Sequence, residues 1–330
     1  MKMNRANMPE GWVAPAPAWS NEWANENDPI VAGYFAAQGG DTGALDAWAA
    51  EALFGDDAPQ QVEQGHFVDA SGVDNHLYIA YWRLSQYDGW WQQHRGWWED
   101  KARENEPAAY WREILSMPLE RTETLHSTPG LHGASLLAEE TVGPIEEHGY
   151  AGGMRDRVPV STTVDLRQTV PIDATLEPHA RNGKRVLIAP PLNMCIIRSG
   201  QNWSNCQGDE ESFYLETLQP VLKEGMRFLR DNPVETHCYS MRYVTKTDRH
   251  WQPLNESFGL GYATDIFAFE DWARSHPTHL AIFDNFMVMA GRFGENIQLQ
   301  LWHEVSALDG KHCEFEYIGC NSTTGLLAYT

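Results

Sequence analysis

Residues 267–305 read FAFEDWARSHPTHLAIFDNFMVMAGRFGENIQLQLWHEV, and this stretch holds three histidines within recognisable helix and strand patterns. Pro277 suits a first helical turn, and the apolar residues after it recur every three to four positions, which predicts a short helix from Thr278 onward. The residues on its apolar face are His279, Ile282, Phe283, Phe286, Met287 and Ala290. One imidazole therefore lies on the apolar face of this helix.

The end of the same stretch predicts a strand. Two sets of side chains alternate here: Leu299, Leu301, His303 and Val305 against Gln298, Gln300, Trp302 and Glu304. Because successive strand side chains point to opposite faces, the first set forms the inward row, and His303 is its one polar member. We expect two imidazoles on adjacent elements, His279 and His303, to point into the apolar interior.

Outside this stretch, strand-like and helix-like segments mix along the whole chain. We predict strands at 76–82, 185–189, 194–199 and 236–244, and helices at 84–104, 108–115 and 210–229, the last broken near Pro220. One internal echo relates the two halves: Tyr87-Asp88-x-Trp90-x-x-x-His94 corresponds to Phe269-Glu270-x-Trp272-x-x-x-His276. A strand followed by an acidic, Trp-anchored helix in each half suggests duplicated α+β modules whose sheets combine into one barrel-like core. An echo of eight residues is also compatible with coincidence.

The N-terminal segment differs in composition from the rest of the chain. Residues 1–28 are rich in Pro, Asn and Trp without periodicity, which predicts an extended arm laid over the body or over a partner subunit. Residues 29–330 are predicted to form a single α+β domain, with two duplicated halves as the interpretation that the echo favours.

Charge and cysteine usage exclude several classes of function. The formal net charge is −22, from 24 basic and 46 acidic residues, and no basic run could neutralise phosphates, so nucleic acid and anionic membranes are poor partners. The start of the chain lacks the apolar core of a secretory signal, and no run approaches about 18 apolar residues, so we expect a cytoplasmic protein. The five scattered cysteines, without CxxC or CxxCH spacing, are interpreted as free thiols.

Each candidate histidine has an ordinary explanation when it is taken alone. His279 on an apolar helical face is more often a core histidine than a ligand, and His276 lacks the cysteine or carboxylate neighbours of a zinc site. His303 is not followed by the second histidine of an HExxH protease motif. The sequence also lacks GxSxG, GxGxxG and Walker loops, which argues against a hydrolase and against nucleotide binding.

Three further segments carry candidate polar groups. Ser199 ends the run MCIIRS, and its strand parity allows its hydroxyl to face the interior beside His303, although simple strand termination explains it as well. Arg155 and Arg157 in GGMRDRVP share one face of a predicted strand, where they could hold a substrate oxygen or a cofactor carboxylate, or stay solvated near a turn. Glu123 in ERTETLHS is uninformative by itself.

Seven sequence blocks, taken in order, resemble a known family. They are PAPAWS (15–20), GYFAAQ (33–38), ERTETLHS (120–127), GYAGGMRDRVP (149–159), IIRSGQNWS (196–204), SHPTHLAIFDNF (275–286) and LWHEVSALDG (301–310). This series, which spans nearly the whole chain, is similar to the haem-containing aldoxime dehydratases. The resemblance implies a lyase that converts R–CH=N–OH to a nitrile and water. It also implies a non-covalent ferrous haem b and a homodimer of α+β subunits. The predicted fold is therefore α+β, with duplicated ferredoxin-like modules forming a barrel-like antiparallel sheet flanked by helices.

The resemblance gives the two histidines of the opening stretch different roles. It implies that His279, the second histidine of HPTH, is the proximal ligand of the haem iron. It implies that His303 of WHEV is the distal histidine, which acts as general acid and then as general base. His276 is left with a structural role. The rival functions are a non-catalytic haem carrier or sensor and a peroxidase-like oxidoreductase on the same scaffold.

The same resemblance assigns the polar groups around the distal histidine. Ser199 of RSGQNWS and one arginine of MRDR would bind the hydroxyl of the oxime, and we favour Arg157 over Arg155 from the spacing of the blocks. Glu123 would belong to the same distal network. The small-molecule aldoxime is the only substrate that the resemblance implies.

Overall fold

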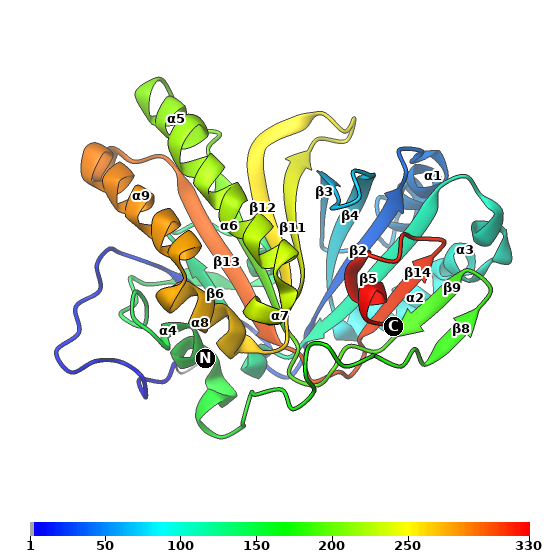
Figure 1. Ribbon diagram of the computed structural model, residues 1–330, viewed down its shortest axis with the longest axis horizontal. Coiled ribbons are helices and arrows are strands. Elements are labelled where there is room, and N and C mark those ends of the chain that lie inside the picture. Colours follow the sequence, from blue (N-terminus) through cyan, green and yellow to red (C-terminus); the bar gives the residue numbers. More distant parts are fainter. Residues whose placement is uncertain (1–2) are drawn as a thin grey trace.

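A computed structural model describes residues 3–330 as an α+β protein built on one large antiparallel sheet flanked by helices (Figure 1). Within these residues, twelve strands form the sheet in the order β6-β13-β10-β12-β11-β3-β4-β2-β5-β14-β9-β8, and β1 pairs separately with β7. The strands are β1 (Ser20–Glu22), β2 (Ile30–Gln38), β3 (Gln61–Val68), β4 (Asp74–Arg83), β5 (Ala109–Met117), β6 (Thr122–His126), β7 (Glu140–Val142), β8 (Ala180–Asn182), β9 (Arg185–Ile188), β10 (Cys195–Asn202), β11 (Cys238–Thr247), β12 (Pro253–Ala263), β13 (Gln300–Ala307) and β14 (Glu314–Ile318).

The helices cover the sheet and close its ends. They are α1 (Gly43–Ala52), α2 (Leu84–His94), α3 (Gly96–Glu99), α4 (Gly153–Arg157), α5 (Asp209–Phe213), α6 (Gln219–Asp231), α7 (Pro233–Thr236), α8 (Ile266–Ser275) and α9 (Pro277–Phe293), with a π-helical segment η5 (Tyr214–Leu218) and short 3-10 turns that include η1 (Lys101–Asn105) and η3 (Gly133–Leu137). No helix in residues 3–330 has the length and apolar character needed to cross a membrane.

Two quartets of strands in the sheet share one order. When the strands of each quartet are numbered along the chain, both quartets have the spatial order 4-1-3-2. The first-listed quartet is β13-β10-β12-β11, and the other is β5-β2-β4-β3. The quartets join where β11 pairs with β3. The echo predicted from the sequence falls at matching places, because α2 follows β4 and α8 follows β12.

Both faces of this sheet are buried. One core cluster gathers side chains from both quartets, among them Tyr34, Tyr81, Phe258 and Tyr262, so the sheet curls around a shared interior. The outer faces are covered separately: α1 to α3 pack on the first quartet, and α6, α8 and α9 cover the second (Figure 1). The side chains of β13 that alternate with His303 are therefore not exposed to solvent, since Trp302 and Glu304 are buried on the interior side of the sheet.

Most of the strands and the helix predicted around the site are confirmed. Helix α9 begins at Pro277 and ends where Gly294 adopts a φ of +54°, a left-handed conformation that glycine allows. The strands predicted at 76–82, 185–189, 194–199 and 236–244 are confirmed as β4, β9, β10 and β11, with ends shifted by up to three residues. The predicted strand near His303 is β13. All five cysteines are free thiols.

Three helix predictions are wrong in part or in full. The segment at 108–115 is a strand, β5, which pairs on one side with β2 and on the other with β14. A strand that is buried on both faces lacks the polar–apolar alternation of a half-exposed strand, so periodicity does not distinguish it from a helix. The helix predicted at 84–104 is divided into α2, α3 and η1. The helix at 210–229 is not broken near Pro220, because the π-helical segment η5 joins α5 to α6 without interruption. The wider π turn before Pro220 leaves room for the proline ring, which has no N–H to donate to that turn.

The N-terminal arm lies against its own chain. The backbone N–H of Asn4 donates to the carbonyl of Asp156 at 2.6 Å, and Trp12 packs edge-on against Tyr150 with ring centroids 5.2 Å apart. Further on, Trp19 forms an isolated bridge with His126 of β6. The arm thus covers α4 and the loop before it, which border the site described next.

Candidate functional site

A cavity of about 520 Å³ lies between the second quartet of strands and the helices that cover it. Its wall is one row of side chains across four adjacent strands, because Leu125, His303, Ser199 and Gly259 are direct partners along β6, β13, β10 and β12. The opposite side is formed by α6, α8 and α9, and residues 149–154, which lead into α4, also line the cavity. The lining is mainly apolar, which suits a flat organic group.

His303 and Ser199 stand directly opposite each other on this wall. The two residues are register partners of β13 and β10, and both line the cavity. Directly paired side chains on one face of an antiparallel sheet have Cβ atoms roughly 5 Å apart. The prediction that the serine lies beside the histidine therefore agrees with the register of the sheet.

Glu123 and Arg157 form a buried group with His303. The Nε of Arg157 donates to Oε2 of Glu123 at 2.7 Å, and its Nη2 donates to Oε1 at 3.1 Å. The Nε2 of His303 lies 2.8 Å from the same Oε1 and 3.2 Å from Nη2 of Arg157. Glu123 and Arg157 are only 4% and 6% exposed, so water does not screen these contacts. Three of the predicted site residues thus converge on one point.

The charges around Glu123 keep its carboxyl group ionised. Burial alone would raise its pKa, but the positive charge of Arg157, the charge of His303 when protonated and the hydrogen bonds from both lower the pKa to about 2. A carboxylate only accepts, so the contact with His303 is a hydrogen bond when Nε2 carries a proton. Arg157 only donates, so its contact with Nε2 is a hydrogen bond when Nε2 carries none. The group therefore offers a partner to either state of this nitrogen.

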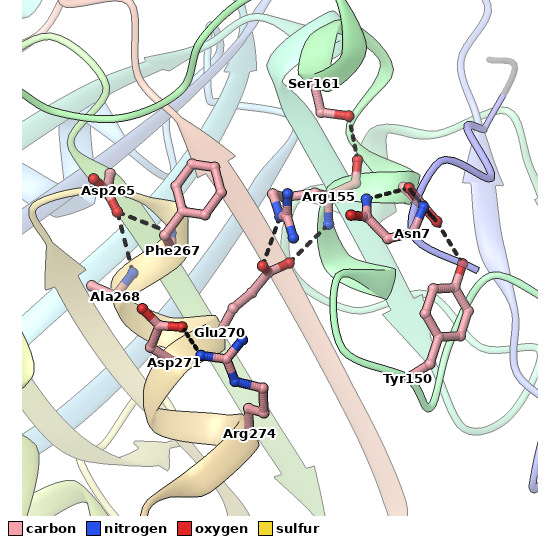
Figure 2. A network of polar contacts seen from close by, with 11 residues as sticks. Asn7, Tyr150, Arg155, Ser161, Asp265, Phe267, Ala268, Glu270, Asp271 and Arg274 are labelled. Carbon is pink, nitrogen blue, oxygen red and sulfur yellow. Dashed lines mark hydrogen bonds and ion pairs between the residues drawn. The ribbon is translucent and has the colours of Figure 1, made fainter. Parts of the chain in front are cut away.

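Arg155 does not belong to this group, and the predicted strand that would hold both arginines is a helix. Residues 153–157 form α4, which starts after Gly152 with a φ of +90°. Positions two apart on a helix point in different directions, so the two guanidinium groups separate. Arg155 instead donates from Nε to Glu270 of α8 at 2.7 Å and lies over the Phe267 ring, as Figure 2 shows for the ion pair.

The N-terminal arm holds α4 in place. Asp156, which lies between the two arginines in sequence and is fully buried, accepts hydrogen bonds from the side chain of Asn7 at 2.7 Å and from the hydroxyl of Tyr150 at 2.9 Å. Ser161 also donates to the carbonyl of Arg155 at 2.6 Å. The position of Arg157 is therefore fixed from several sides, and the arm contributes to it.

His279 enters the cavity from the opposite side. It lies in the first turn of α9, lines the cavity and packs edge-on against Trp272 of α8 at 4.8 Å between ring centroids. Its Nδ1 is buried without a hydrogen-bond partner. Burial lowers the pKa of His279, and the nearby backbone carbonyl of Ala273 offsets part of this lowering. A neutral imidazole facing an apolar cavity is a suitable ligand for iron.

His276 serves the helix instead. Its Nδ1 accepts from the backbone N–H of Thr278 at 3.3 Å, and its ring stacks on Phe228 at 4.2 Å. It caps the start of α9 and is not among the residues that line the cavity. The structural role given to His276 agrees with this position.

Sequence reasoning missed several polar groups near the site. Glu270 lines the cavity, and burial raises its pKa although Arg155 partly opposes this. Arg198 and Glu304 are buried on the other face of the wall, immediately beside Ser199 and His303 in sequence. A charged residue within an otherwise apolar strand was the available signal for the last two, in MCIIRS and in WHEVS.

Known proteins share both the sequence and this fold. A sequence model of the family described as "Haem-containing dehydratase" matches residues 32–326. The chain is 36% identical to an aliphatic aldoxime dehydratase of Pseudomonas chlororaphis, over 97% of this chain and 93% of that protein. It is 34% identical to a phenylacetaldoxime dehydratase of Bacillus sp. (strain OxB-1), over 98% and 94%.

Two crystal structures superpose on it closely. One is of an aldoxime dehydratase, with a TM-score of 0.90 and 34% identity over 100% of this chain and 96% of that one. The other is of an aldoxime dehydratase in complex with butyraldoxime, with a TM-score of 0.90 and 32% identity over 98% and 92%. By sequence and by structure, the chain belongs to the haem-containing dehydratase family.

Proposed function

We propose that this protein dehydrates aldoximes, R–CH=N–OH, to nitriles, R–C≡N, with release of water. The observation that carries the proposal is the cavity that His303, Ser199 and Arg157 line together with His279, with Glu123 paired to Arg157 and His303 behind its lining. This arrangement supplies a proton donor, hydrogen-bond donors for a leaving oxygen and a metal ligand in one cavity. Relatives at 33–36% identity are named aldoxime dehydratases.

The residues present fit a haem. The cavity is large, mainly apolar and bounded on one side by the sheet, and the one imidazole on its helical side is neutral and has an Nδ1 without a partner. His279 would hold the iron from this side. We propose haem b, held without covalent bonds, since the sequence has no CxxCH attachment site. The expected check is that acid–acetone or acid–butanone extraction removes all haem from the purified protein; colour retained by the chain would contradict it.

When bound, a ferrous haem held by His279 would supply the iron chemistry that weakens the N–O bond of the oxime. His303, on the opposite wall, would act as the general acid. Its proton goes to the hydroxyl oxygen of the oxime, the N–O electron pair leaves with that oxygen, and water is formed.

Ser199 and Arg157 would bind the same oxygen. Ser199 is the direct strand partner of His303, and the guanidinium of Arg157 lies 3.2 Å from its Nε2, so the histidine has both donors as neighbours. Fixed donors in a site that excludes water stabilise a developing charge without reorganising. Glu123 would act by orienting Arg157 and His303 rather than by touching the substrate.

His303 would also complete the reaction as a base. After it has given up its proton, the neutral imidazole can accept the proton on the oxime carbon, and the C–H electron pair becomes the third bond of the nitrile. Glu123 can accept from Nε2 when this nitrogen is protonated, and Arg157 can donate to it when it is not. The same histidine can therefore serve as the acid and then as the base. The histidine ends the cycle as it began, and no net oxidation or reduction occurs.

The proposal is tested with the purified protein, reduced with dithionite and mixed with a panel of aliphatic and aryl aldoximes. We expect nitrile, measured by gas chromatography, to form at the rate at which aldoxime is consumed. A protein that binds haem but forms no nitrile from any oxime would be a carrier or sensor. Peroxide-driven dye oxidation without nitrile would instead indicate an oxidoreductase.

We also propose that the two strand quartets are duplicated ferredoxin-like modules. Support comes from their identical strand order and from the matching positions of Trp90 in α2 and Trp272 in α8. Fragments 3–118 and 119–330, expressed together as separate chains, should then reassemble and bind haem. Failure to reassemble would count against independent modules.

Two further expectations concern the protein in its cell. We propose a homodimer, supported by the exposed apolar side chains of α9, which include Phe283, Met287 and Val288 at 47%, 43% and 58% exposure. Sedimentation of a monomer at micromolar concentration would contradict it. A cytoplasmic location stays a prediction that cell fractionation can test.

A further inference from the structure

Among residues 3–330, the lining of the cavity comes from one part of the chain. All of its lining residues lie between positions 125 and 303, so the first strand quartet, β2 to β5, supplies none of them. The first quartet nevertheless reaches the wall from behind. It does so through the enclosed interior that the two quartets share.

Behind the wall, Arg198 and Glu304 form a second cross-strand pair. They are direct partners of β10 and β13, one position away from the pair of Ser199 and His303. Because strand side chains alternate, the two pairs point to opposite faces of the sheet. Arg198 is 0% exposed and Glu304 is 2% exposed, so a charged pair backs the wall of the cavity inside the protein core.

Tyr81, from β4 of the first quartet, connects these two side chains. Its hydroxyl donates to Oε1 of Glu304 at 2.6 Å and accepts from Nη1 of Arg198 at 2.8 Å. The backbone N–H of Ala134 donates to the other oxygen of Glu304 at 2.6 Å. Glu63 of β3 forms an ion pair with Nη2 of Arg198 at 2.6 Å. We call Tyr81, Glu304, Arg198 and Glu63 the rear network.

The other half contains a reciprocal pair. Tyr262 of β12 stands where Tyr81 stands in β4, and its hydroxyl donates at 2.7 Å to Glu113 of β5, as Tyr81 donates to Glu304 of β13. Arg242 donates twice to this Glu113, at 2.6 and 2.7 Å. Each tyrosine thus reaches across the interior to the fourth strand of the other quartet. Only one of the two glutamates, Glu304, lies on a strand that carries residues of the cavity.

A buried charged network usually gives less stability than apolar side chains of the same size. Its hydrogen bonds have defined directions, however, and they fix a strand against sliding and rotation in a way that apolar contacts do not. A displacement of about 1 Å in a reacting group can lower a rate by about 10²-fold. The rear network is placed to prevent such a displacement in β10 and β13.

We propose that Tyr81 and Glu304 are positioning residues that set His303 and Ser199 against the bound substrate by fixing β13 and β10 from the interior side. The first half of the chain then takes part in the reaction without touching the cavity. The inference rests on the proposed function, because it takes His303 and Ser199 as the reacting residues.

The chain offers a matched control for the test. Tyr81→Phe and Tyr262→Phe each remove one hydroxyl from a buried Tyr–Glu pair between the halves, but only the first pair adjoins the wall of the cavity. The readout is the infrared C–O stretching band of the reduced, carbon monoxide-bound holoprotein, which responds to polar groups near the distal side of a haem. We expect Tyr81→Phe to shift or broaden this band and Tyr262→Phe to leave it as in the parent.

Kinetics provide the second readout. Tyr81→Phe should lower kcat for nitrile formation by about 10- to 100-fold with little change in KM, since a displaced acid alters the reacting step more than binding. Tyr262→Phe should keep kcat near that of the parent. Equal effects of the two variants on the band and on kcat would overturn the proposal and leave a purely structural network.

If Tyr81→Phe fails to fold, Glu304→Gln and Glu113→Gln form the same comparison. They keep the size of the side chain and remove one accepting oxygen. The infrared band needs no aldoxime, so it tests the positioning role even if the parent protein forms no nitrile, in which case the proposed function alone fails. Unchanged bands in both Tyr81→Phe and Glu304→Gln would refute the inference.

Discussion

Replacing Glu123 with glutamine should destabilise the protein strongly and in a pH-dependent way. The side chain keeps its size, but one accepting oxygen becomes a donor. Oε2 accepts from Arg157, and Oε1 accepts from Arg157 and from a protonated His303, so a donor faces a donor whichever way the amide turns. The variant also leaves the buried guanidinium of Arg157 without its counter-charge.

The magnitude follows from the acidity of Glu123. Its pKa falls from 4.5 to about 2 in the folded protein, and since a tenfold change in acidity equals about 1.4 kcal/mol, the ionised carboxylate contributes about 3 kcal/mol. Breaking a buried ion pair typically costs about 3 to 5 kcal/mol, which agrees. We therefore expect Glu123→Gln to lose about 3 to 5 kcal/mol in free energy of unfolding at pH 7.

The sign of the pH dependence is fixed by the direction of this change. Because the folded pKa is the lower one, the stabilisation is complete above pH 4.5 and disappears as the pH falls through about 2. The difference between parent and variant should thus be about 2 kcal/mol smaller at pH 3 than at pH 7. Urea unfolding followed by tryptophan fluorescence measures both values.

A surface variant serves as the control. Glu146, whose side chain is 62% exposed, pairs with the exposed Arg5 at 3.1 Å, and Glu146→Gln should change the free energy of unfolding by less than about 1 kcal/mol. The reasoning is refuted if Glu123→Gln loses no more than this control at pH 7, or if its loss is the same at pH 7 and at pH 3.

Three further experiments with single substitutions separate the roles of neighbouring residues. His279→Ala should lose stoichiometric haem on purification while His276→Ala keeps it, as judged by the Soret absorbance; the reverse result would make His276 the ligand. Arg157→Ala should lower nitrile turnover by at least about 10²-fold and Arg155→Ala should keep most of it, whereas equal losses would count against the assignment. Asp156→Ala should free the N-terminal arm and speed its cleavage by trypsin, and an unchanged digestion rate would contradict that role.

The sequence was sufficient for the elements that carry the two histidines. Helical spacing after Pro277 and strand alternation around His303 both correspond to observed elements, because each pattern extends over several residues and has one clear period. The parity of Ser199 was also correct. Its position directly opposite His303 depends on the register of two strands that are about a hundred residues apart in sequence, which no local pattern determines.

The arginines show where local reasoning was insufficient. The sequence GGMRDRVP predicts a strand with both arginines on one face, whereas Gly152 precedes a short helix that turns them apart. Their partners, Glu123 and Glu270, come from distant segments, so the different environments of Arg155 and Arg157 arise only in the folded chain.

The rear network was missed for a related reason. Strand alternation predicts that Glu304 lies in the row opposite the inward one, but this sheet has a buried interior on that side as well. A sheet covered by helices on one face and curled around a core on the other leaves no exposed row. Tyr81 lies in β4 of the first quartet, so its contact with Glu304 of β13 joins the two halves and arises only in the folded chain.

The most direct test of the central claim is nitrile formation by His303→Ala at full haem loading. Because His279 remains in place, we expect normal haem content together with a loss of turnover of at least about 10²-fold, as general acid and base catalysis requires. A variant that binds haem normally and still forms nitrile within about twofold of the parent rate would contradict the assignment of proton transfer to His303.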